Sequence, residues 1–299
     1  MGYVFSSMRA SRMLLDEPTL DIFFAFFLFL LGSCIGSFLN VVAHRLPLNM
    51  SVVRPPSHCP NCSAPVPTVG LIPVIGYFLV KMRCSNCGVR VSWVYPLIEL
   101  ICGMGTVFLF FQTLTPIQFI SAIWPEVASG AQLGGMRFQP LIQLITRLFL
   151  FYTALPLTLI DLRHRILPDV ITLGGTPIAL FLGGANLALG WKGAVAGALV
   201  GSGLLLFVAK TYEVLRGREG LGLGDVKYMA LIGAIVGWQG VLIVLGLASI
   251  LGSLVGIALG ISKRAGLQTA LPFGPFLAVA ALLVCLWQPI ILQFFFEDA

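Results

Sequence analysis

Long runs of apolar residues, separated by short polar segments, dominate the chain. A membrane-spanning helix needs roughly 20 mostly apolar residues to cross the hydrocarbon core of a bilayer. The pattern predicts about eight such helices, at residues 22–43, 93–111, 141–160, 170–189, 193–212, 226–238, 241–261 and 271–294. The sixth run is short and nearly joins the seventh through Gly237-Trp-Gln-Gly240, where the signal for a boundary is weakest.

The composition supports this reading of the pattern. Hydrophobic residues make up 58% of the 299 positions and charged residues 10%, whereas a soluble domain carries about 25% charge. The first apolar run is too long for the core of a signal peptide and lacks a basic flank with a small-residue cleavage site. We therefore expect an all-α, polytopic integral membrane protein that retains its first span.

The basic residues predict the orientation, because lysine and arginine concentrate in short cytoplasmic loops. Most of the 18 basic residues fall on one side of the expected spans, at Arg45, Arg54, Lys81, Arg83, Arg90, Arg163, Arg165, Lys210, Arg216, Arg218, Lys227, Lys263 and Arg264. The loop from residue 44 to 92 is then cytoplasmic, and both termini face away from the cytoplasm. The net charge of +6 is thus a topology signal. Without a basic run interleaved with aromatic residues, we expect no nucleic-acid partner.

The loop of residues 44–92 is rich in Pro, Ser and Cys and is too long for a simple turn between helices. We expect a small folded domain there, and divide the chain into a first segment (1–43), a cytoplasmic domain (44–92) and a membrane core (93–299). The loop of residues 113–140 looks irregular and carries no evident chemistry.

Four cysteines within the cytoplasmic loop have the spacing of a metal site. Cys59-Pro-Asn-Cys62 and Cys84-Ser-Asn-Cys87 form two C-x2-C pairs, and two such pairs complete a tetrahedral four-sulfur Zn²⁺ site. Two disulfides are the alternative, but they require an oxidising compartment, which the expected topology does not provide. Four sulfur ligands leave no open position, so the zinc would be structural. His58 could replace a ligand, although a solvated loop histidine is the simpler interpretation.

Two carboxylates stand at the ends of predicted spans, where a charge is expensive and usually functional. Asp161 ends the third span and Asp225 begins the sixth, so two intervening spans return the chain to the same membrane face. A carboxyl pair in contact can activate water and protonate a leaving amine, as in aspartyl proteases. Gly222 and Gly224 would let a substrate or second helix approach the backbone. From the residues alone, a helix cap at Asp225 and an ion pair at Asp161 remain equally open.

Other polar residues are weaker candidates. Asp169 follows Pro168 and is interpreted as the cap of the fourth span. Glu99 lies near the start of the second span with no visible partner. Cys34, Cys102 and Cys285 stand singly in apolar runs and are interpreted as packing residues. A zinc-binding transporter or scaffold with a carboxylate proton relay is an alternative class, and it predicts carboxylates near the middle of the membrane.

Six ordered stretches resemble the type IV prepilin peptidases, a family of membrane aspartyl proteases with a GxGD signature. They are "GSFLNVVAHRLP" from Gly36, the two cysteine pairs, "YPLIEL" from Tyr95, "IDLRHRILPD" from Ile160, "GLGLGDVK" from Gly220 and "PFGPFLA" from Pro272. The resemblance extends from the first span to the last. It implies that Asp161 and Asp225 are the catalytic pair and that Cys59, Cys62, Cys84 and Cys87 bind zinc.

The same resemblance implies a function at the cytoplasmic face of the bacterial inner membrane. Family members cleave the basic leader of type IV prepilins or type II secretion pseudopilins after a glycine. Those with the tetracysteine domain usually also methylate the new N-terminus with S-adenosylmethionine. This chain has Leu71 where the family often has Asn and Gly76 where it often has Ser, a departure that bears on the methyltransferase activity. A peptidase lacking that activity is the alternative, and no motif indicates where the methyl donor binds.

Overall fold

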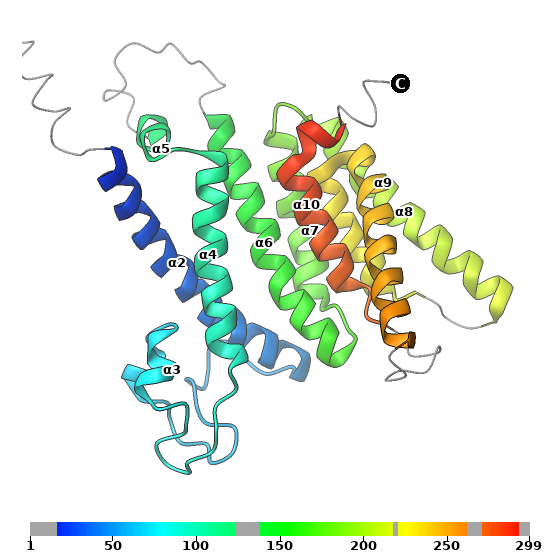
Figure 1. Ribbon diagram of the computed structural model, residues 1–299. Helices are drawn as coiled ribbons and strands as arrows, with labels where there is room; N and C mark the ends of the chain where they lie inside the picture. The colour runs from blue at the N-terminus through cyan, green and yellow to red at the C-terminus, as the bar shows by residue number, and fades with distance from the viewer. Residues whose placement is uncertain (1–16, 124–137, 218–220, 262–270, 293–299) are drawn as a thin grey trace, which may run out of the picture. The chain divides into compact units, whose positions relative to one another are not determined.

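The structure is a computed structural model, and it describes residues 17–123, 138–217, 221–261 and 271–292. Over these residues the regular structure is helical, and β-structure is limited to two isolated bridges (Figure 1). The expectation of an all-α fold is therefore confirmed. The chain divides into two compact units, one of Met1–Asn40 with Val53–Leu144 and one of Val41–Val52 with Ile145–Ala299. The division of the sequence at residues 43 and 92 stays a prediction.

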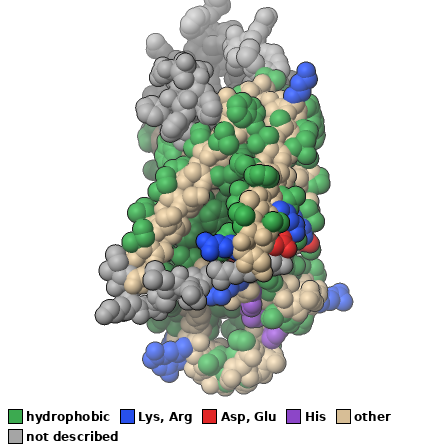
Figure 2. Space-filling view, turned by 90° about the vertical axis from the view of Figure 1, so that its right-hand side faces the viewer, with side chains coloured by type: hydrophobic (Ala, Val, Ile, Leu, Met, Phe, Trp, Pro, Cys, Tyr) green, Lys and Arg blue, Asp and Glu red, His purple; other side chains and the backbone are tan. Residues whose placement is uncertain are grey.

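Five of the described helices are long and apolar enough to cross a membrane. They are α2 (Glu17–Arg45), α4 (Val94–Thr113), α6 (Gln139–His164), α8 (Gly190–Arg216) and α9 (Leu223–Ile261). Two shorter helices, α7 (Asp169–Ala185) and α10 (Gly274–Leu292), are also apolar. Hydrophobic side chains cover much of the face seen in Figure 2, as a lipid-exposed surface requires. The expected multi-pass character is confirmed, whereas the number of eight spans stays a prediction.

Helix α9 reverses direction at Gly237. Its 39 residues would reach about 58 Å as one straight helix, roughly twice the hydrocarbon thickness. Gly237 has φ 73° and ψ 173°, which interrupts the helix, and a Cβ added at Gly233 would lie 3.1 Å from Val241 Cγ2. Residues eight positions apart in a continuous helix are about 12 Å apart. The reversal therefore falls where the sequence places its weakest boundary.

In the first unit, α2 and α4 pack closely through small residues. A Cβ on Gly36 would lie 2.8 Å from Cβ of Cys102, and Gly32 would contact Thr106 in the same way. Small residues four positions apart let two membrane helices approach closely. Asn40 then donates a hydrogen bond of 3.1 Å to the carbonyl of Tyr95. These contacts hold the two helices that flank the cysteine-containing segment.

Short helices occupy the connections before and after α4. The segment between α2 and α4 contains η1 (Leu46–Leu48), η2 (Thr68–Leu71) and α3 (Ile75–Leu79). The region after α4 was expected to be irregular, but Pro116–Ile123 forms α5. The Phe119 ring of α5 lies 5.6 Å from that of Phe110, and this aromatic contact stabilises a helix too short to persist alone. The rest of that loop, residues 124–137, lies outside the described residues.

In the second unit, α9 forms the centre of the core. Tyr228, Met229 and Ile232 on α9 are fully buried. Helix α8 packs against α9 through Gly197, whose added Cβ would contact the carbonyl oxygen of Gly233, and Gly201, whose added Cβ would lie 2.8 Å from the Met229 carbonyl oxygen. Close backbone approach of this kind fixes α9, and with it the residues at its N-terminus.

Candidate active site

Asp161 lies in the last turn of α6, and only 5% of its surface is exposed. Its Oδ2 accepts a hydrogen bond of 2.9 Å from the backbone amide of Gly274, the first residue of α10. The position of Gly274 is sterically tight, because an added Cβ would lie 2.6 Å from the same oxygen. The carboxylate of one helix is thus oriented by the N-terminus of another.

Asp225 lies in the first turn of α9 and is 9% exposed. Its backbone amide donates a hydrogen bond of 3.1 Å to the carbonyl of Gly222, and its Oδ2 lies 3.6 Å from the position of a Cβ on Gly222. The free amides in the first turn of a helix favour a carboxylate beside them. The Asp225 carboxylate therefore lies where the start of its own helix favours a negative charge.

The structure brings Asp161 and Asp225 into one site. The two carboxylates interact electrostatically. The side chain of Leu167, from the loop after α6, contacts both glycines next to them: it lies 3.0 Å from the position of a Cβ on Gly224 and 3.3 Å from that of a Cβ on Gly274. Three helix ends and one loop therefore meet around a buried pair of carboxyl groups.

Asp169 lies outside this pair, and its predicted role as a helix cap is wrong. Helix α7 begins at Asp169 itself, the N-cap position is occupied by Pro168, and no side chain caps the helix. The exposed Asp169 carboxylate instead accepts hydrogen bonds of 2.7 and 2.9 Å from Nζ of Lys227. Because Asp169 is solvated and paired, it is a poor candidate for the buried acid or base.

Two residues of the site were missed by sequence reasoning. Gly274 lies in the stretch "PFGPFLA" and Leu167 in "IDLRHRILPD", both of which contributed to the family resemblance without receiving a role. The signal for Gly274 was available: a glycine between Phe273 and Pro275, at the start of an apolar run, indicates a backbone that something approaches closely.

The four cysteines of the loop form one cluster, in which all Sγ atoms lie within 4.8 Å of one another. Sγ of Cys59 is 3.8 Å from Sγ of Cys87, and Sγ of Cys62 is 3.8 Å from Sγ of Cys84. Tetrahedral Zn–S bonds of about 2.3 Å place sulfur atoms about 3.8 Å apart. All four cysteines are free thiols, so the geometry fits a zinc ion and does not fit a pair of disulfides.

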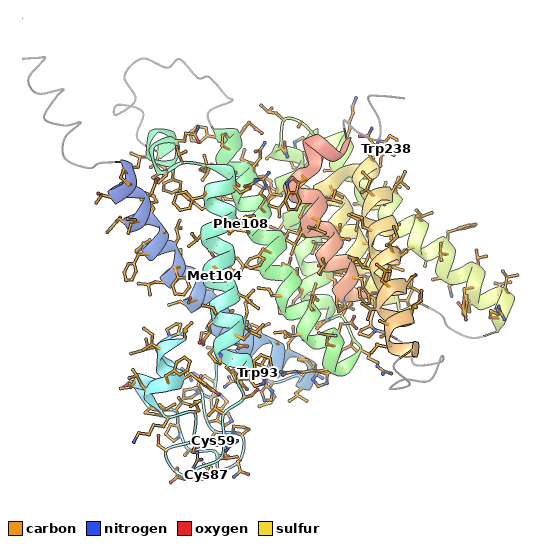
Figure 3. All side chains as sticks on the ribbon, in the orientation of Figure 1. Cys59, Cys87, Trp93, Met104, Phe108 and Trp238 are labelled. Atoms are coloured by element: carbon orange, nitrogen blue, oxygen red, sulfur yellow. The ribbon has the colours of Figure 1, made fainter. Side chains whose placement is uncertain are left out.

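The two cysteine pairs have the same backbone fold. The amide of Ser63 bonds the Cys59 carbonyl and the amide of Gly88 bonds the Cys84 carbonyl, each at 2.9 Å. Hydrogen bonds from the Val89 amide and the Asn61 side chain lower the pKa of the Cys87 thiol to about 6. A low pKa favours the thiolate, which is the form that binds metal. Figure 3 shows Cys59 and Cys87 together in this segment.

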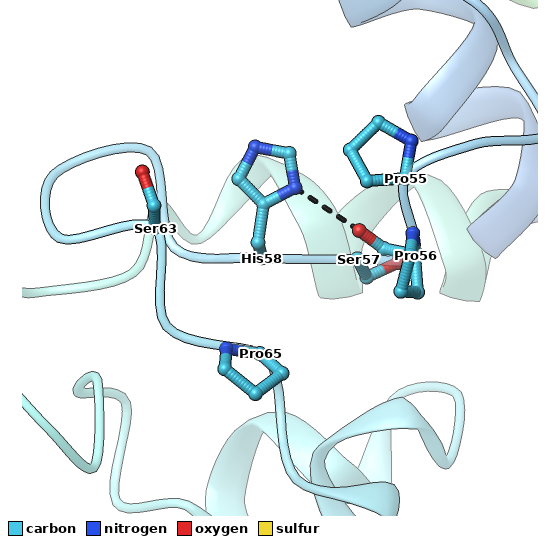
Figure 4. Close-up of a pocket in the computed structure, with 6 residues that line it drawn as sticks. All are labelled: Pro55, Pro56, Ser57, His58, Ser63 and Pro65. Atoms are coloured by element: carbon cyan, nitrogen blue, oxygen red, sulfur yellow. Dashed lines mark hydrogen bonds between the residues drawn. The ribbon is translucent and has the colours of Figure 1, made fainter.

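His58 is not part of the cysteine cluster. Its Nδ1 lies 3.0 Å from the carbonyl of Pro56, and it lines a pocket of about 370 Å³ together with Pro55, Pro56, Ser57, Ser63 and Pro65 (Figure 4). The interpretation of His58 as a loop residue is consistent with this geometry. The lining has no carboxylate to neutralise a cationic ligand, so the pocket gives no support for binding the methyl donor.

Two further expectations, on Glu99 and on the three single cysteines, are resolved by hydrogen bonding and burial. Glu99, which had no visible partner in the sequence, is 9% exposed and accepts a hydrogen bond of 2.7 Å from the backbone amide of Val74. Cys102 and Cys285 are buried, as packing residues should be, but Cys34 is exposed. Packing within this chain therefore does not account for Cys34.

Comparison with known proteins gives a consistent result. The bacterial peptidase A24 N-terminal domain matches residues 30–113, and the type IV leader peptidase family matches residues 148–257. A prepilin leader peptidase/N-methyltransferase of Pseudomonas putida is 32% identical over 86% of this chain and 88% of its own length. Proteins of the same name from Aeromonas hydrophila and Myxococcus xanthus are 32% and 38% identical, over 90% and 82% of this chain and 93% and 66% of their own lengths. No solved structure matches significantly.

Proposed function

The chain belongs to the type IV leader peptidase family, and on that premise we propose that it is a membrane aspartyl endopeptidase with Asp161 and Asp225 as its catalytic pair. Its substrates are type IV prepilins or type II secretion pseudopilins, whose basic leader it removes after a glycine. The observation that carries the proposal is that two buried carboxylates, at the ends of α6 and α9, interact electrostatically in one site. By the distribution of basic residues, this end faces the cytoplasm of a bacterial inner membrane.

The chemistry follows from two carboxyl groups that share a buried site. Such groups do not ionise together, so one is a carboxylate while the other keeps its proton. The carboxylate takes a proton from water as the water oxygen attacks the scissile carbonyl carbon, and the neutral carboxyl group donates its proton to the carbonyl oxygen. When the tetrahedral intermediate collapses, the C–N bond breaks, the leaving nitrogen takes up the proton that the first group gained from water, and a hydroxyl group of the intermediate returns its proton to the other carboxylate. The Gly274 amide holds Asp161 in place throughout.

The position of the pair also fits the substrate. A prepilin leader is a short basic segment followed by an apolar helix, so its scissile bond lies where cytosol and bilayer meet. Asp161 is in the last turn of α6 and Asp225 in the first turn of α9. A proton relay in a transporter requires carboxylates deeper in the membrane, and we therefore do not favour that alternative.

We further propose that the four cysteines hold a structural zinc ion and that the enzyme methylates the new N-terminal amine with S-adenosylmethionine. The sulfur geometry supports the metal, and the printed name of the relatives supports the methyl transfer. We assign no residues to the methyl donor. Zinc would supply no open coordination position for chemistry, because four sulfur ligands complete its shell.

The test is cleavage of a prepilin by the purified full-length protein in lipid nanodiscs. We expect Asp161→Asn and Asp225→Asn each to lower the rate by at least about a hundredfold, whereas the matched control Asp169→Asn should stay close to the wild type. Wild-type cleavage by either Asn variant would contradict the catalytic pair. Mass analysis of the product with the methyl donor present should show one added methyl group. An unmethylated product would mean that the protein is a peptidase without methyltransferase activity.

A further inference from the structure

The segment between η2 and α3 exposes an unusual amount of apolar surface. Six large apolar side chains, which we call the apolar patch, are each between 46% and 61% exposed: Leu71, Ile72, Ile75, Phe78, Leu79 and Met82. They fall within twelve consecutive positions outside any predicted span. Soluble surfaces rarely leave so many neighbouring apolar side chains in water, and such patches mark a site of protein or membrane interaction.

The depth of this segment can be derived from α4. That helix has 20 residues and is about 30 Å long, which only just matches the hydrocarbon thickness. Its first residue, Val94, must therefore lie near the membrane boundary, and Glu99 is about 8 Å further in. Because Glu99 Oε2 is 2.7 Å from the Val74 amide, the segment that carries the apolar patch is tied to the first turns of a spanning helix.

Aromatic residues mark the same level. Trp93 and Tyr95 stand at the start of α4 and are 65% and 39% exposed, and Figure 3 shows Trp93 at the end of α4 that adjoins the cysteine segment. Trp and Tyr are enriched where the headgroups of a bilayer meet its hydrocarbon. The apolar patch is therefore continuous, through Val74 and Glu99, with a part of the molecule that lies at the membrane interface.

The charge of the segment identifies the kind of surface it fits. There is no Asp or Glu between His44 and Ile98, whereas Lys81 and Arg83 flank Met82 in the sequence. A short apolar surface bordered by basic residues is typical of segments that lie in the plane of an anionic lipid interface. A groove for the basic leader of a substrate would need acidic residues, and this segment has none.

The backbone around α3 has a conformation that needs stabilising contacts from outside the segment. Val74, Lys81 and Met82 have φ of 61°, 54° and 59°, a region that non-glycine residues avoid, and β-branched residues most of all. These positions bracket α3, a helix of only five residues. A strained, short helix with an exposed apolar surface needs contacts beyond those inside the segment, and lipid at the interface supplies them.

We propose that residues 68–82 form an interfacial anchor, in which the apolar patch inserts beneath the headgroups of the membrane that α4 crosses while Lys81 and Arg83 contact anionic phosphates. This anchor is separate from the peptidase chemistry. It fixes the height of the cysteine cluster relative to the bilayer, because Met82 precedes Cys84 by two residues.

The test is photocrosslinking of the full-length protein in nanodiscs, with p-benzoylphenylalanine in place of Phe78. Val89 is the matched control position, since it is apolar and 39% exposed but lies on the second cysteine pair, outside the apolar patch. We expect lipid adducts at position 78 at about tenfold the yield at position 89, and several-fold more in phosphatidylglycerol than in phosphatidylcholine. Zinc content checks that each labelled protein is folded, and position 75 serves as a second site if position 78 is not tolerated.

Four outcomes would overturn the proposal in whole or in part. Crosslinking of position 78 mainly to a second copy would identify a dimer interface, and crosslinking mainly to another part of the same chain would identify an internal contact. Equal lipid yields at positions 78 and 89 would mean that the apolar patch does not enter the bilayer. Equal yields in the two lipids would overturn the contact of Lys81 and Arg83 with anionic phosphates.

Discussion

Gly274 and Asp161 are 113 residues apart in the sequence, yet the amide of the first donates a 2.9 Å hydrogen bond to the carboxylate of the second. The same glycine leaves no room for a side chain, because a Cβ would lie 2.6 Å from Oδ2. An amide donor aimed at a buried carboxylate both satisfies that oxygen and fixes its orientation. The N-terminus of α10 therefore acts as a positioning element for the proposed catalytic pair.

We predict that Gly274→Ala lowers kcat/KM for prepilin cleavage by about ten- to a hundredfold, because displacing a catalytic group by about 1 Å can cost a hundredfold. The measurement is steady-state cleavage in nanodiscs. Gly174→Ala is the control, since nothing lies within 4 Å of a Cβ at that position of the same unit. If both alanine variants cleave equally well, the Gly274 contact does not position Asp161.

The two acidic residues of the site could be identified from the sequence, but the residues that surround them could not. Asp161 and Asp225 stood out because a carboxylate at the end of an apolar run is rare. The contacts of the Gly274 amide and of the Leu167 side chain depend on which helix ends lie next to each other. Hydrophobic periodicity predicts the helices but not which of their ends are neighbours. Asp169 shows the opposite error: a local capping rule assigned it to its own helix, but Lys227 from another helix pairs with it.

Loss of one zinc ligand should separate the two proposed activities. We predict that the wild type binds one zinc ion per chain and that Cys59→Ser loses most of it, because a structural zinc site contributes its binding free energy to folding. Cys59→Ser should lower methylation or folding of its segment more than the rate of leader cleavage, since the cysteines and the aspartates are remote in sequence. The measurements are elemental analysis and product mass.

Cys34→Ser is the control for this experiment, since Cys34 is exposed on α2 and outside the cluster. It should retain full zinc content. Normal zinc content in Cys59→Ser would contradict the tetracysteine site, and a loss of cleavage as large as the loss of methylation would show that the two activities depend equally on the metal.

The fold was predictable where its signals are local. Apolar runs gave the helices, and the C-x2-C spacing gave the cysteine cluster. The partner of Glu99 was not predictable, because Val74 contributes a backbone amide, which has no sequence signature. Helix α5 was missed because its eight residues are too few for a clear helical pattern and depend on aromatic contacts between Phe119 and residues of other helices.

Packing of α8 against α9 gives a stability prediction. A side chain at Gly197 would contact the carbonyl oxygen of Gly233, and overpacking of this kind destabilises by about 1–3 kcal/mol. We predict that Gly197→Ala lowers the free energy of unfolding by that amount, whereas Gly203→Ala, with open space around the added Cβ, should be neutral or stabilising by up to about 1 kcal/mol. Unfolding in mixed micelles measures both changes. An unchanged free energy of unfolding in Gly197→Ala would show that α8 and α9 can move apart at this position without loss of stability.

The matching backbone of the two cysteine pairs leads to a reciprocal prediction. Ser63 has φ 56° and Gly88 has φ 71°, so the two pairs place different residues in the same left-handed conformation, which costs a non-glycine residue about 1–2 kcal/mol. We expect Ser63→Gly to bind zinc more tightly and Gly88→Ser to bind it less tightly, each by roughly five- to tenfold. Competition with a chelator of known affinity measures both changes in the full-length protein. Shifts of the same sign for the two variants would mean that the hydroxyl group, and not the backbone conformation, decides the affinity at these positions.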